Sequence, residues 1–403
     1  MKIVHINTYN TGGAAKACLR LHAALLNKNI NSKVVLLYKT DDSIPEVYDF
    51  RDYNRGSLQF WIDKFRNRIR NDYDRIRLAL KSPSAKPFSF PNTTWDIMKH
   101  PIVKEADIIH LHWVAGFLDY NSFFKQCHQK IIWTLHDELP FSGGYHYEND
   151  WTDSINSALL NKNIEIKLAA LAKTNIDIIC LSNYIHAKSI KSKIFQSYQH
   201  HQIKNGVPEN NFNFKNKNEI KTKLNLPLNK KMILYIADNI NYKRKGFSYF
   251  YEAINKIDLR TNIAVIVGTK RPVGLPENKS IRFYEKINEE LMMSNFYSAA
   301  DVLVIPSLED NQPNVMTEAL CCGLPVVAFK NTGIIEMINE QNGIFAQHQN
   351  ADSLASAIQE ALVSTTFNAE AIATAAKKIY CDTTMAEKHI ELYNKRIHTP
   401  TNF

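Results

Sequence analysis

The sequence predicts an α/β protein built from two doubly wound, Rossmann-like domains. Two observations carry this prediction. Short apolar runs of the length of buried strands alternate with helical patterns in two separate series, which is typical of parallel sheets covered on both faces. The chain has 403 residues, too many for one ordinary domain and enough for two.

The composition is that of a folded globular protein, with 45% hydrophobic and 22% charged residues. No apolar run approaches the roughly 18 residues of a membrane span, and the N-terminus has no secretory pattern, so we expect a cytoplasmic protein. Six cysteines without any C-x-x-C pair favour reduced thiols over a zinc knuckle or a disulfide framework. A net charge of +9 favours an anionic ligand or an anionic surface, but it does not indicate which of the two.

The first series of elements opens with a βαβ unit. Lys2–Asn7 reads as a strand, a helical pattern begins at Ala14, and Lys33–Tyr38 reads as a second strand. Three further buried-type strands follow, at Ala106–Trp113, Lys130–Leu135 and Ile176–Ser182. The first half is therefore expected to form one doubly wound domain, residues 1–205.

One segment of this half departs from the α/β rhythm. Apolar residues recur at helical spacing from Leu58 to Leu80, and between Phe60 and Lys81 seven basic residues stand against three acidic ones. The pattern predicts a basic amphipathic helix over 58–81. Three interpretations stay open: a solvated helix that covers the domain, a helix that lies on anionic lipid, and a nucleic-acid contact.

The second series begins after the turn signals of Asn205–Pro208. Its expected strands are 232–237, 263–268, 281–283, 301–306 and 325–329, and its expected helices are 246–257, 289–299 and 315–322. This predicts a second Rossmann-like domain over 206–380. The tail is helical in pattern from Ala369 to about His398, and its part 381–403 is expected to reach back to the first domain.

The turn between the first strand and the first helix is a candidate anion site. It carries Gly12 and Gly13, which let a ligand approach the backbone near the helix N-terminus. The spacing is not G-x-G-x-x-G, so it does not predict a dinucleotide site, and an ordinary tight turn explains it as well.

Histidines mark the ends of two neighbouring strands of this domain. His110 and His112 are two residues apart in one strand, and His136 with Asp137 ends the next. Ligands of open α/β sheets bind at the carboxyl ends of the strands, which favours a functional role for His136. Core histidines bonded to backbone carbonyls are the alternative, and a metal site that includes His146 is a lesser one.

The segment 305–327 holds the most specific pattern. A strand ends, a polar turn carries Asp310, a helix starts near Asn314, and Glu318 lies one turn inside it. Such a helix N-terminus can hold a diphosphate, and a carboxylate can accept two hydrogen bonds from the vicinal hydroxyls of a ribose.

With these residues in place, the sequence resembles the retaining glycosyltransferases of family 4, which have the GT-B fold of two Rossmann-like domains facing a central cleft. The family hallmark is two acids separated by seven residues, as Asp310 and Glu318 are, before a Pro-Val-Val strand. Several motifs follow in the order seen in capsule, exopolysaccharide and colanic-acid-type members, and they span nearly the whole chain: Gly12–Ala15, Ala106–Trp113, Thr134–Asp137, Pro140–Tyr147, Asn205–Val207, Arg244–Phe247 and Asn342–Gly343.

The resemblance implies transfer of a hexose-type sugar from a UDP- or GDP-linked donor, with retention at the anomeric carbon, without a metal ion and without another cofactor. It implies His136, Asp137 and Asp310 as catalytic residues. The donor-binding residues that it implies are Gly12, Gly13, Arg244, Lys245, Asn311, Pro313, Asn314, Val315 and Glu318. On the acceptor side it implies His112, Gly143, Gly144 and His146.

The sequence also departs from the family pattern. Asp310 stands where most members have Glu, and the Arg that many members carry before Lys245 is missing, which leaves Lys243 or Arg244 as the second cation. Leu139 replaces a usual Trp and Tyr145 a usual Cys. These departures bear on the sugar contact and on acceptor specificity.

The expected partners are therefore a nucleotide sugar and a saccharide acceptor. We expect the acceptor to be lipid-linked and the reaction to belong to surface polysaccharide biosynthesis at the inner face of the cytoplasmic membrane. Two alternatives keep the fold: an inactive sugar-binding partner subunit and a nucleotide-sugar epimerase. A nucleic-acid partner is not expected, since the basic residues gather in one segment rather than around aromatic platforms.

Overall fold

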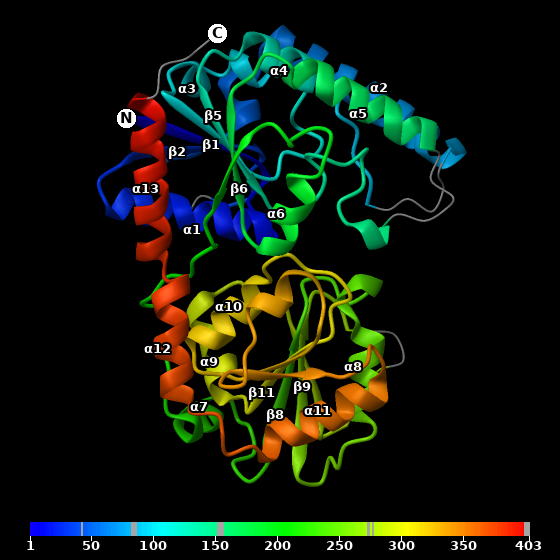
Figure 1. Cartoon of the computed structure of the whole chain (residues 1–403), viewed down its shortest axis with the longest axis vertical. Coiled ribbons are helices and arrows are strands. Elements are labelled where there is room, and N and C mark those ends of the chain that lie inside the picture. The colour runs from blue at the N-terminus through cyan, green and yellow to red at the C-terminus, as the bar shows by residue number, and fades with distance from the viewer. Residues whose placement is uncertain (42, 82–86, 151–156, 272–274, 276–277, 399–403) are drawn as a thin grey trace. The chain divides into compact units, whose positions relative to one another are not determined.

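The computed structural model describes residues 1–403 except 42, 82–86, 151–156, 272–274, 276–277 and 399–403. The chain divides into two compact units (Figure 1). Unit 1 comprises Met1–Lys204 together with Met385–Phe403, and unit 2 comprises Asn205–Thr384. Each unit is built on its own parallel sheet with helices on both faces.

The sheet of unit 1 has seven strands in the order β3-β2-β1-β4-β5-β6-β7. All neighbouring strands pair in parallel. The strands are β1 (Lys2–Tyr9), β2 (Asn31–Tyr38), β3 (Val47–Asp49), β4 (Ile108–Leu111), β5 (Lys130–Leu135), β6 (Ile176–Cys180) and β7 (Gln199–Gln202). The order reverses between β1 and β4, so the topological switch point lies between these two strands.

The central strands of this sheet are largely apolar on both faces because both faces are covered, with His5 and His110 as buried polar exceptions. Trp133 and Ile131 of β5 face a core that also holds Phe117 and Phe195, while Ile132 faces the opposite core. The helices are α1 (Gly13–Asn27), α2 (Leu58–Lys81), α3 (Pro101–Lys104), α4 (Tyr120–Gln126), α5 (Ser157–Leu171), α6 (Asn183–Ser189) and α13 (Asp382–His398).

The C-terminal tail, which is helical in pattern from Ala369 to about His398, forms two helices. α12 (Ala369–Tyr380) ends before Cys381, whose backbone is extended and pairs with Val207 in a parallel bridge. The amide of Val207 donates to the carbonyl of Tyr380, and the amide of Asp382 donates to the carbonyl of Val207. These two hydrogen bonds join Val207 to the break between the helices. They are a tertiary constraint, and the helical periodicity of the sequence does not predict it.

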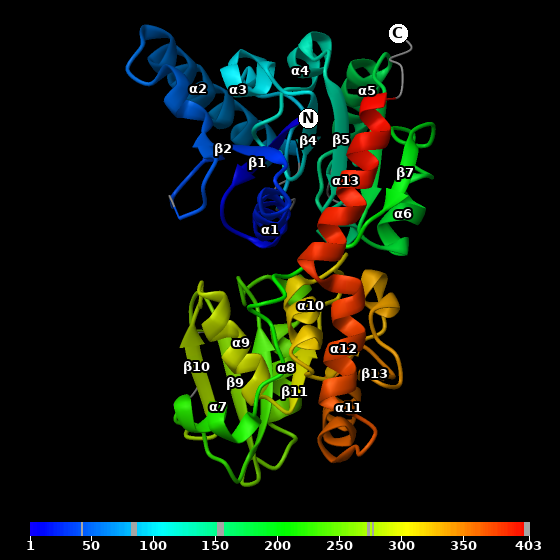
Figure 2. The same ribbon diagram turned by 90° about the vertical axis from the view of Figure 1, so that its left-hand side faces the viewer.

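After this break, α13 packs on the sheet of unit 1 (Figure 2). The Tyr393 hydroxyl lies 2.7 Å from His110 Nδ1 on β4, and Arg396 pairs with Asp177 of β6 at 2.8 Å. Its apolar side chains complete a core with residues of β1, α1, β4, β5 and β6. The last helix of the chain is thus a structural part of unit 1.

The sheet of unit 2 has six parallel strands in the order β10-β9-β8-β11-β12-β13. They are β8 (Lys231–Ile236), β9 (Asn262–Gly268), β10 (Ile281–Glu285), β11 (Val302–Ile305), β12 (Val326–Phe329) and β13 (Gly343–Ala346). Here the order reverses between β8 and β11. The helices are α7 (Lys217–Lys223), α8 (Phe247–Ile254), α9 (Glu290–Ala299), α10 (Asn314–Cys321), α11 (Ala351–Val363) and α12.

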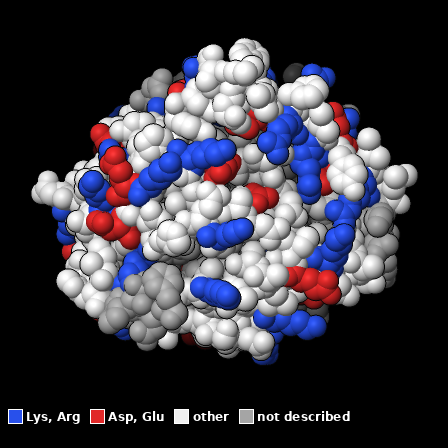
Figure 3. Space-filling model, turned by 90° about the horizontal axis from the view of Figure 1, so that it is seen from above, with Lys and Arg blue, Asp and Glu red and all other residues white. Residues whose placement is uncertain are grey.

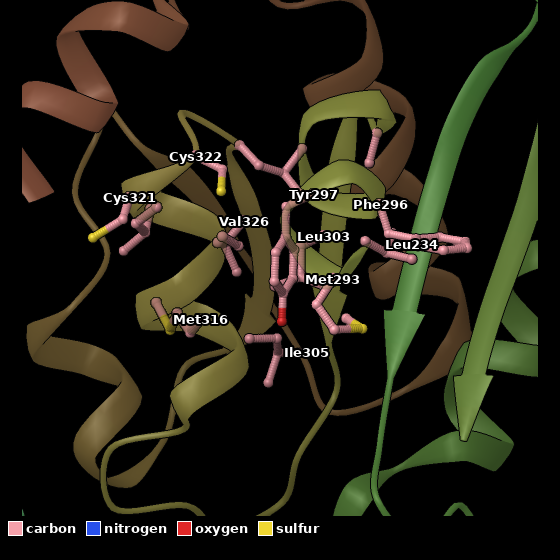
Figure 4. Close-up of a cluster of buried hydrophobic side chains, with 14 of the residues drawn as sticks. Leu234, Met293, Phe296, Tyr297, Leu303, Ile305, Met316, Cys321, Cys322 and Val326 are labelled. Carbon is pink, nitrogen blue, oxygen red and sulfur yellow. The ribbon is translucent and has the colours of Figure 1, made fainter. Parts of the chain in front are cut away.

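One core of unit 2 surrounds Tyr297 of α9. In Figure 4 its ring stands among Met293, Leu303 and Val326, which are all buried. The strands supply branched aliphatic side chains and the helices supply Met, Phe and Cys, so the space between sheet and helices is filled. This packing holds α9 and α10 against the strands that position the site described below.

Helix α2 spans Leu58–Lys81, as the amphipathic pattern predicts, but its apolar side does not cover unit 1. Ile62, Phe65, Ile69 and Tyr73 are all exposed. Among the side chains of this helix that the structure describes, residues 58–80, the buried one is the polar Asn67. The helix does lie on unit 1, through the contact of Asn67 with Thr94 and of Leu78 with Leu160, but its apolar face is left exposed. In the described part of the chain, no helix combines the length and apolar character needed to cross a membrane.

Candidate functional site

The residues expected to bind the donor in unit 2 follow the two strands at its switch point. Lys245 lies in the segment after β8, and Asp310 lies in the turn after β11. These strands are neighbours and parallel, so their carboxyl ends meet at one edge of the sheet. Ligands of open α/β sheets bind in the crevice at this position.

The two side chains meet there as an ion pair. Lys245 Nζ donates to Asp310 Oδ2 at 2.5 Å, and Arg244 Nη1 lies 3.7 Å from the same oxygen. Arg244 Nη1 also donates to the carbonyl of Glu309 at 2.6 Å. Of the two candidates for a second cation, Arg244 is the one beside Asp310, whereas Lys243 is exposed.

Burial and charge shift the pKa of both partners. Burial alone would raise the pKa of Asp310, but Lys245 and Arg244 outweigh it and hold that pKa below its ordinary value. Burial lowers the pKa of Lys245, an effect that the Asp310 carboxylate opposes. Asp310 is therefore an anion at neutral pH, held between two basic side chains.

Gly246 sets the backbone that carries this cation pair. Its φ is +67°, and a Cβ at this position would lie 1.9 Å from the carbonyl oxygen of Pro306. The turn after β8 thus touches the turn after β11 backbone to backbone, and only glycine permits that approach. The Leu308 amide donates to the carbonyl of Arg244 at 2.8 Å and closes the same contact.

The turn that carries Asp310 is fixed from a third segment. The Thr332 hydroxyl donates to the carbonyl of Asp310 at 2.7 Å, and the amide of Gly333 donates to the same carbonyl. Thr332 has a φ of +43°, which is a strained conformation for a β-branched residue. Thr332 was not among the predicted site residues, because no feature of the sequence marks a threonine with a strained backbone.

The turn leads directly into α10, which begins at Asn314 and whose first turn has neither a side-chain cap nor an acidic residue. Its N-terminal end is therefore electrostatically suited to an anion. Asn311 and Pro313 are buried in the turn, while Asn314 and Val315 are partly exposed. Gln312 exchanges hydrogen bonds with the backbone of Asn205 at 2.9 and 3.0 Å and ties the turn to the start of unit 2.

Glu318 lies on α10 and is buried. Its Oε2 accepts a hydrogen bond of 2.7 Å from the Tyr297 hydroxyl of α9. Sequence reasoning missed Tyr297, since an aromatic residue on the apolar face of a helix is interpreted as a core residue. Its ring is core, but its hydroxyl fixes the carboxylate expected to bind ribose.

The candidate site of unit 1 lies at the switch point between β1 and β4. Gly12, with a φ of +93°, precedes α1, whose first turn carries no acidic residue. A Cβ at Gly12 would meet nothing within 4 Å, so space as well as backbone freedom is present there. The amide of Thr8 donates to the carbonyl of Trp113 at 2.8 Å and joins the ends of β1 and β4. Gly13 is the first residue of α1.

Three histidines form a hydrogen-bonded row in this unit. His136 Nε2 lies 3.1 Å from His112 Nδ1, and His112 Nε2 lies 3.0 Å from His5 Nδ1. Burial lowers the pKa of His136 to about 4 and lowers those of His112 and His5 well below their ordinary value. All three rings are therefore neutral at pH 7, and His112 orients the ring of His136. His5 was missed because a lone histidine inside a strand carries no motif.

Two members of this row, His5 and His112, also form a buried cluster with His110. Single nitrogens of His5, His110 and His112 lie within 4.8 Å of one another, a spacing compatible with a metal ion. Both nitrogens of His110 already have partners, the Tyr393 hydroxyl at 2.7 Å and the Thr134 hydroxyl at 2.8 Å. The group thus serves as a polar layer between the sheet and α13.

Asp137 is the centre of a separate network. Its Oδ2 accepts hydrogen bonds of 2.7 Å from both Trp113 Nε1 and His146 Nδ1, and its Oδ1 accepts from the amide of Leu139 at 3.1 Å. Burial would raise the pKa of Asp137, but His146 and the other donors lower it. This geometry makes Asp137 an organiser of the loop after β5, with His146 bound to it.

The loop between these residues is closed by its glycines and by a buried lysine. A Cβ at Gly143 would lie 2.7 Å from Leu160 Cα, and one at Gly144, where φ is +138°, would enter the ring of Phe88. Lys167 of α5 donates to the carbonyls of Leu139 at 2.5 Å and Ser142 at 2.9 Å. Burial lowers the pKa of Lys167 to about 7. The sequence offers no signal for it, since lysines are rarely buried.

These side chains border a small cavity within unit 1. Its lining is mostly apolar and aromatic, with His112, His136, Asp137 and Lys167 as the polar members. The cavity, about 20 Å³, has room for about one water molecule, so it brings these polar groups together but does not itself hold a sugar. The structure thus brings together the histidines and the aspartate of unit 1, and separately the cations and the aspartate of unit 2.

Comparisons with known proteins agree with this geometry. The family model described as "Glycosyl transferases group 1" matches residues 230–364, the part of unit 2 that holds Lys245, Asp310 and Glu318. An uncharacterised glycosyltransferase of Methanocaldococcus jannaschii is 25% identical over 276 residues, which cover 64% of this chain and 67% of that protein. The N,N'-diacetylbacillosaminyl-diphospho-undecaprenol alpha-1,3-N-acetylgalactosaminyltransferase of Campylobacter jejuni is 27% identical over 43% of this chain and 47% of its own length.

Among solved structures, the Anabaena protein HepE in complex with UDP and glucose matches with a TM-score of 0.70 at 16% identity, covering 98% of this chain and 99% of its own. At this identity the likeness concerns the fold. It confirms the predicted fold class of two Rossmann-like domains of the GT-B type. The fold, the family match over part of unit 2 and the relatives together support a glycosyltransferase of the GT-B type.

Proposed function

We propose that the protein is a retaining glycosyltransferase of family 4 that moves a hexose-type sugar from a UDP- or GDP-linked donor to a saccharide acceptor. The acceptor is lipid-linked, the product belongs to a surface polysaccharide, and the reaction runs at the inner face of the cytoplasmic membrane without a metal ion or other cofactor. The relative from Campylobacter, whose name contains an undecaprenol-linked sugar, and HepE, solved with UDP, support the acceptor and donor classes.

The observation that carries the proposal is the meeting of Lys245, Arg244 and Asp310 at the switch point of unit 2, next to the start of α10. The leaving group of a nucleotide sugar is a nucleoside diphosphate, on which negative charge grows as the bond to the sugar breaks. Fixed cations and a helix N-terminus stabilise that charge without reorganisation, which lowers the barrier. Asp310 is then available to sugar hydroxyls once phosphate competes for Lys245.

Retention follows from a front-face reaction in this proposal. The bond between the anomeric carbon and the phosphate oxygen breaks with its electron pair going to the phosphate. The acceptor oxygen bonds to the same face of the carbon, and its proton passes to the departing phosphate. Such a step needs no protein nucleophile, and a trapped covalent glycosyl-enzyme adduct would overturn it.

Unit 1 supplies the acceptor side. His136 is neutral at pH 7 because its pKa is lowered to about 4, so it can exchange hydrogen bonds with sugar hydroxyls but does not act as a cationic acid. Asp137 borders the same cavity as His136 and is held by His146, while Gly143 and Gly144 allow the close packing of the loop that follows. We expect His136→Ala to reduce turnover and Glu318→Ala to weaken nucleotide binding.

Thermal stabilisation by UDP, GDP, ADP and CMP, each with and without EDTA, tests the proposal. We expect one nucleoside diphosphate to stabilise the protein equally in both conditions, and Lys245→Ala to weaken that binding at least tenfold. Lys256→Ala is the matched control, because it removes another ion-paired lysine of unit 2, bonded to Asp352, away from the switch point.

The matching sugar nucleotide then separates the remaining alternatives. Slow hydrolysis of the donor without acceptor, and sugar transfer with it, support a transferase. An epimerised donor would indicate an epimerase, and binding without any turnover would indicate an inactive partner subunit. Stabilisation abolished by EDTA would contradict the metal-independent reaction.

A further inference from the structure

Helix α2 is built with its polar side toward unit 1 and its apolar side toward solvent. The side chains of Asp63, Asn67, Arg70 and Asp74 recur at helical spacing and are buried or partly buried. The Thr94 hydroxyl donates to Asn67 Oδ1 at 3.3 Å, and Arg70 pairs with Asp74 at 2.9 Å. Near the helix end, Leu78 packs on Leu160 of α5. These contacts attach α2 through a mainly polar face.

The opposite side is a continuous apolar stripe. Phe65 is 65% exposed and Leu80 is 81% exposed, and every other member of the stripe is also an exposed large hydrophobic residue. Positions 65 and 67 are two residues apart, which places them about 200° apart around a helix. The stripe therefore points away from unit 1. It consists of Leu58, Trp61, Ile62, Phe65, Ile69, Tyr73, Ile76 and Leu80.

Exposed basic residues border this stripe. Lys64, Arg66, Arg68 and Arg75 are all exposed, and by helical geometry Arg66 lies along one border while the others lie along the opposite border. Lys64 Nζ stands 4.9 Å from the centre of the Trp61 ring, and Arg75 pairs loosely with Asp72 at 3.2 Å. Basic side chains are also spread over the surface of unit 1 that Figure 3 shows.

We propose that this face of α2 is a membrane-docking surface that lies in the interfacial region of a bilayer containing anionic phospholipids. A helix of 24 residues is about 36 Å long and presents aromatic and aliphatic side chains to the acyl boundary while cations reach headgroup phosphates. Trp61 and Tyr73 suit the interface, where rings with a polar atom are favoured. Seven basic residues against three acidic ones make the helix complementary to an anionic surface.

The inference rests on the proposed function for its purpose, because a lipid-linked acceptor must be met at a membrane. Its physical basis is independent of catalysis, since α2 contributes no residue to either candidate site. A vesicle-binding experiment therefore tests the docking surface, and a nucleotide-binding experiment tests the proposed function, independently of each other.

The test is co-sedimentation of the full chain with vesicles of phosphatidylcholine and phosphatidylglycerol in a 7:3 ratio, compared with phosphatidylcholine alone. We expect binding to the mixed vesicles, at least tenfold weaker binding to the neutral ones, and a decrease at high salt. The triple variant Phe65→Ser, Ile69→Ser, Ile76→Ser should lose at least tenfold in affinity for both. These side chains are exposed, so the variant should keep its melting temperature.

The matched control is the triple variant Phe214→Ser, Val363→Ser, Ile379→Ser, which removes exposed hydrophobic side chains of unit 2 and should bind vesicles like the wild type. Lys64→Gln, Arg66→Gln, Arg68→Gln should weaken binding to mixed vesicles alone. Thermal stabilisation by UDP, if the wild type shows it, should be unchanged in all three variants.

Unimpaired vesicle binding by the α2 apolar variant, or absence of binding by the wild type, would overturn the proposal. So would a wild-type dimer in sedimentation equilibrium that this variant converts to monomer while vesicle binding persists, because the stripe would then join two copies. Vesicle binding by a wild type that transfers no sugar would leave the docking surface standing and remove the proposed function.

Discussion

At the scale of single residues, the candidate site of unit 1 depends on groups whose charge state is set by burial. Lys167 is the clearest case, since its ammonium would be buried beside two carbonyls, a cost that the Asp137 carboxylate offsets only in part. Its pKa of about 7 means that near-neutral solutions contain both forms. A neutral amine has two N–H donors, which is the number of carbonyls that it contacts.

This predicts a pH dependence of stability with a definite sign. An unfolded lysine titrates near 10.4, so between pH 7 and about 10 the unfolded chain binds the proton that folded Lys167 has lost. The free energy of unfolding of the wild type relative to Lys167→Met should therefore rise with pH, by at most about 1.4 kcal/mol per pH unit. All five tryptophans precede residue 205, so tryptophan fluorescence in urea reports on unit 1.

Lys173→Met, at an exposed position near the end of α5, controls for the introduced methionine. A wild-type minus Lys167→Met difference that stays constant from pH 7 to 9 would show that Lys167 remains charged in the folded state.

At the scale of elements, the site of unit 2 exists because two turns touch. The strand β8 ends in the turn with Lys245, the strand β11 ends in the turn with Asp310, and Gly246 allows their backbones to meet. The cation and the anion are therefore positioned by backbone geometry, not by long flexible side chains.

Gly246→Ala should accordingly damage both stability and nucleotide binding. The variant adds a Cβ that would lie 1.9 Å from the Pro306 carbonyl, in addition to the cost of a left-handed backbone. Gly56→Ala is the matched control, because Gly56 has a similar φ of +83° but nothing within 4 Å of the added Cβ. We expect about 1 kcal/mol for the control and more for Gly246→Ala, measured by calorimetry.

The stabilisation of unit 2 by UDP should also fall in Gly246→Ala and stay unchanged in Gly56→Ala. Equal losses in the two variants would mean that the contact with Pro306 relaxes easily and does not position Lys245.

The elements also show what the sequence can and cannot predict. Lys130–Leu135 was predicted to the residue, because a short, mainly apolar run is typical of a buried parallel strand. The strand β7, Gln199–Gln202, has no such run and is placed only by its pairing with β6. Likewise, the apolar periodicity predicted the bounds of α2. The side of α2 that packs on the domain depends on contacts with Thr94 and Leu160, and the helical periodicity carries no information about these contacts.

The same distinction holds for the site. Asp310, Lys245 and His136 were identifiable because they stand in motifs at strand ends. Tyr297, Thr332 and Lys167 were not, because they act through tertiary hydrogen bonds or a strained backbone, which have no local signature. Motifs thus single out the candidate site residues, and the structure adds the residues that hold them in place.

At the scale of the whole molecule, the two units differ in how the chain builds them. Unit 2 is one continuous segment, whereas unit 1 needs the distant segment Met385–Phe403. Within it, Tyr393 is fully buried and, with Leu392 and Met385, completes the core beneath Ile3 and Ile132.

We therefore expect opposite behaviour from two fragments. Residues 205–384 should fold on their own and be stabilised by the same nucleoside diphosphate as the full chain. Residues 1–204 should be unstable or aggregate, since loss of α13 uncovers one core and leaves His110 and Asp177 without Tyr393 and Arg396. Circular dichroism melts of both fragments check this, and a cooperative melt of 1–204 near that of the full chain would contradict it.

The return of α13 also has a consequence for recombination. In topological terms unit 2 is an insertion inside unit 1, with junctions after Lys204 and after Thr384, and both ends of the protein belong to the same unit. A single crossover within unit 2, between the genes of two proteins with this topology, would combine the unit 1 sheet of one parent with the helix α13 of the other. Exchange of donor preference by domain grafting must therefore carry both junctions, together with the Val207–Cys381 pairing that lies just inside them.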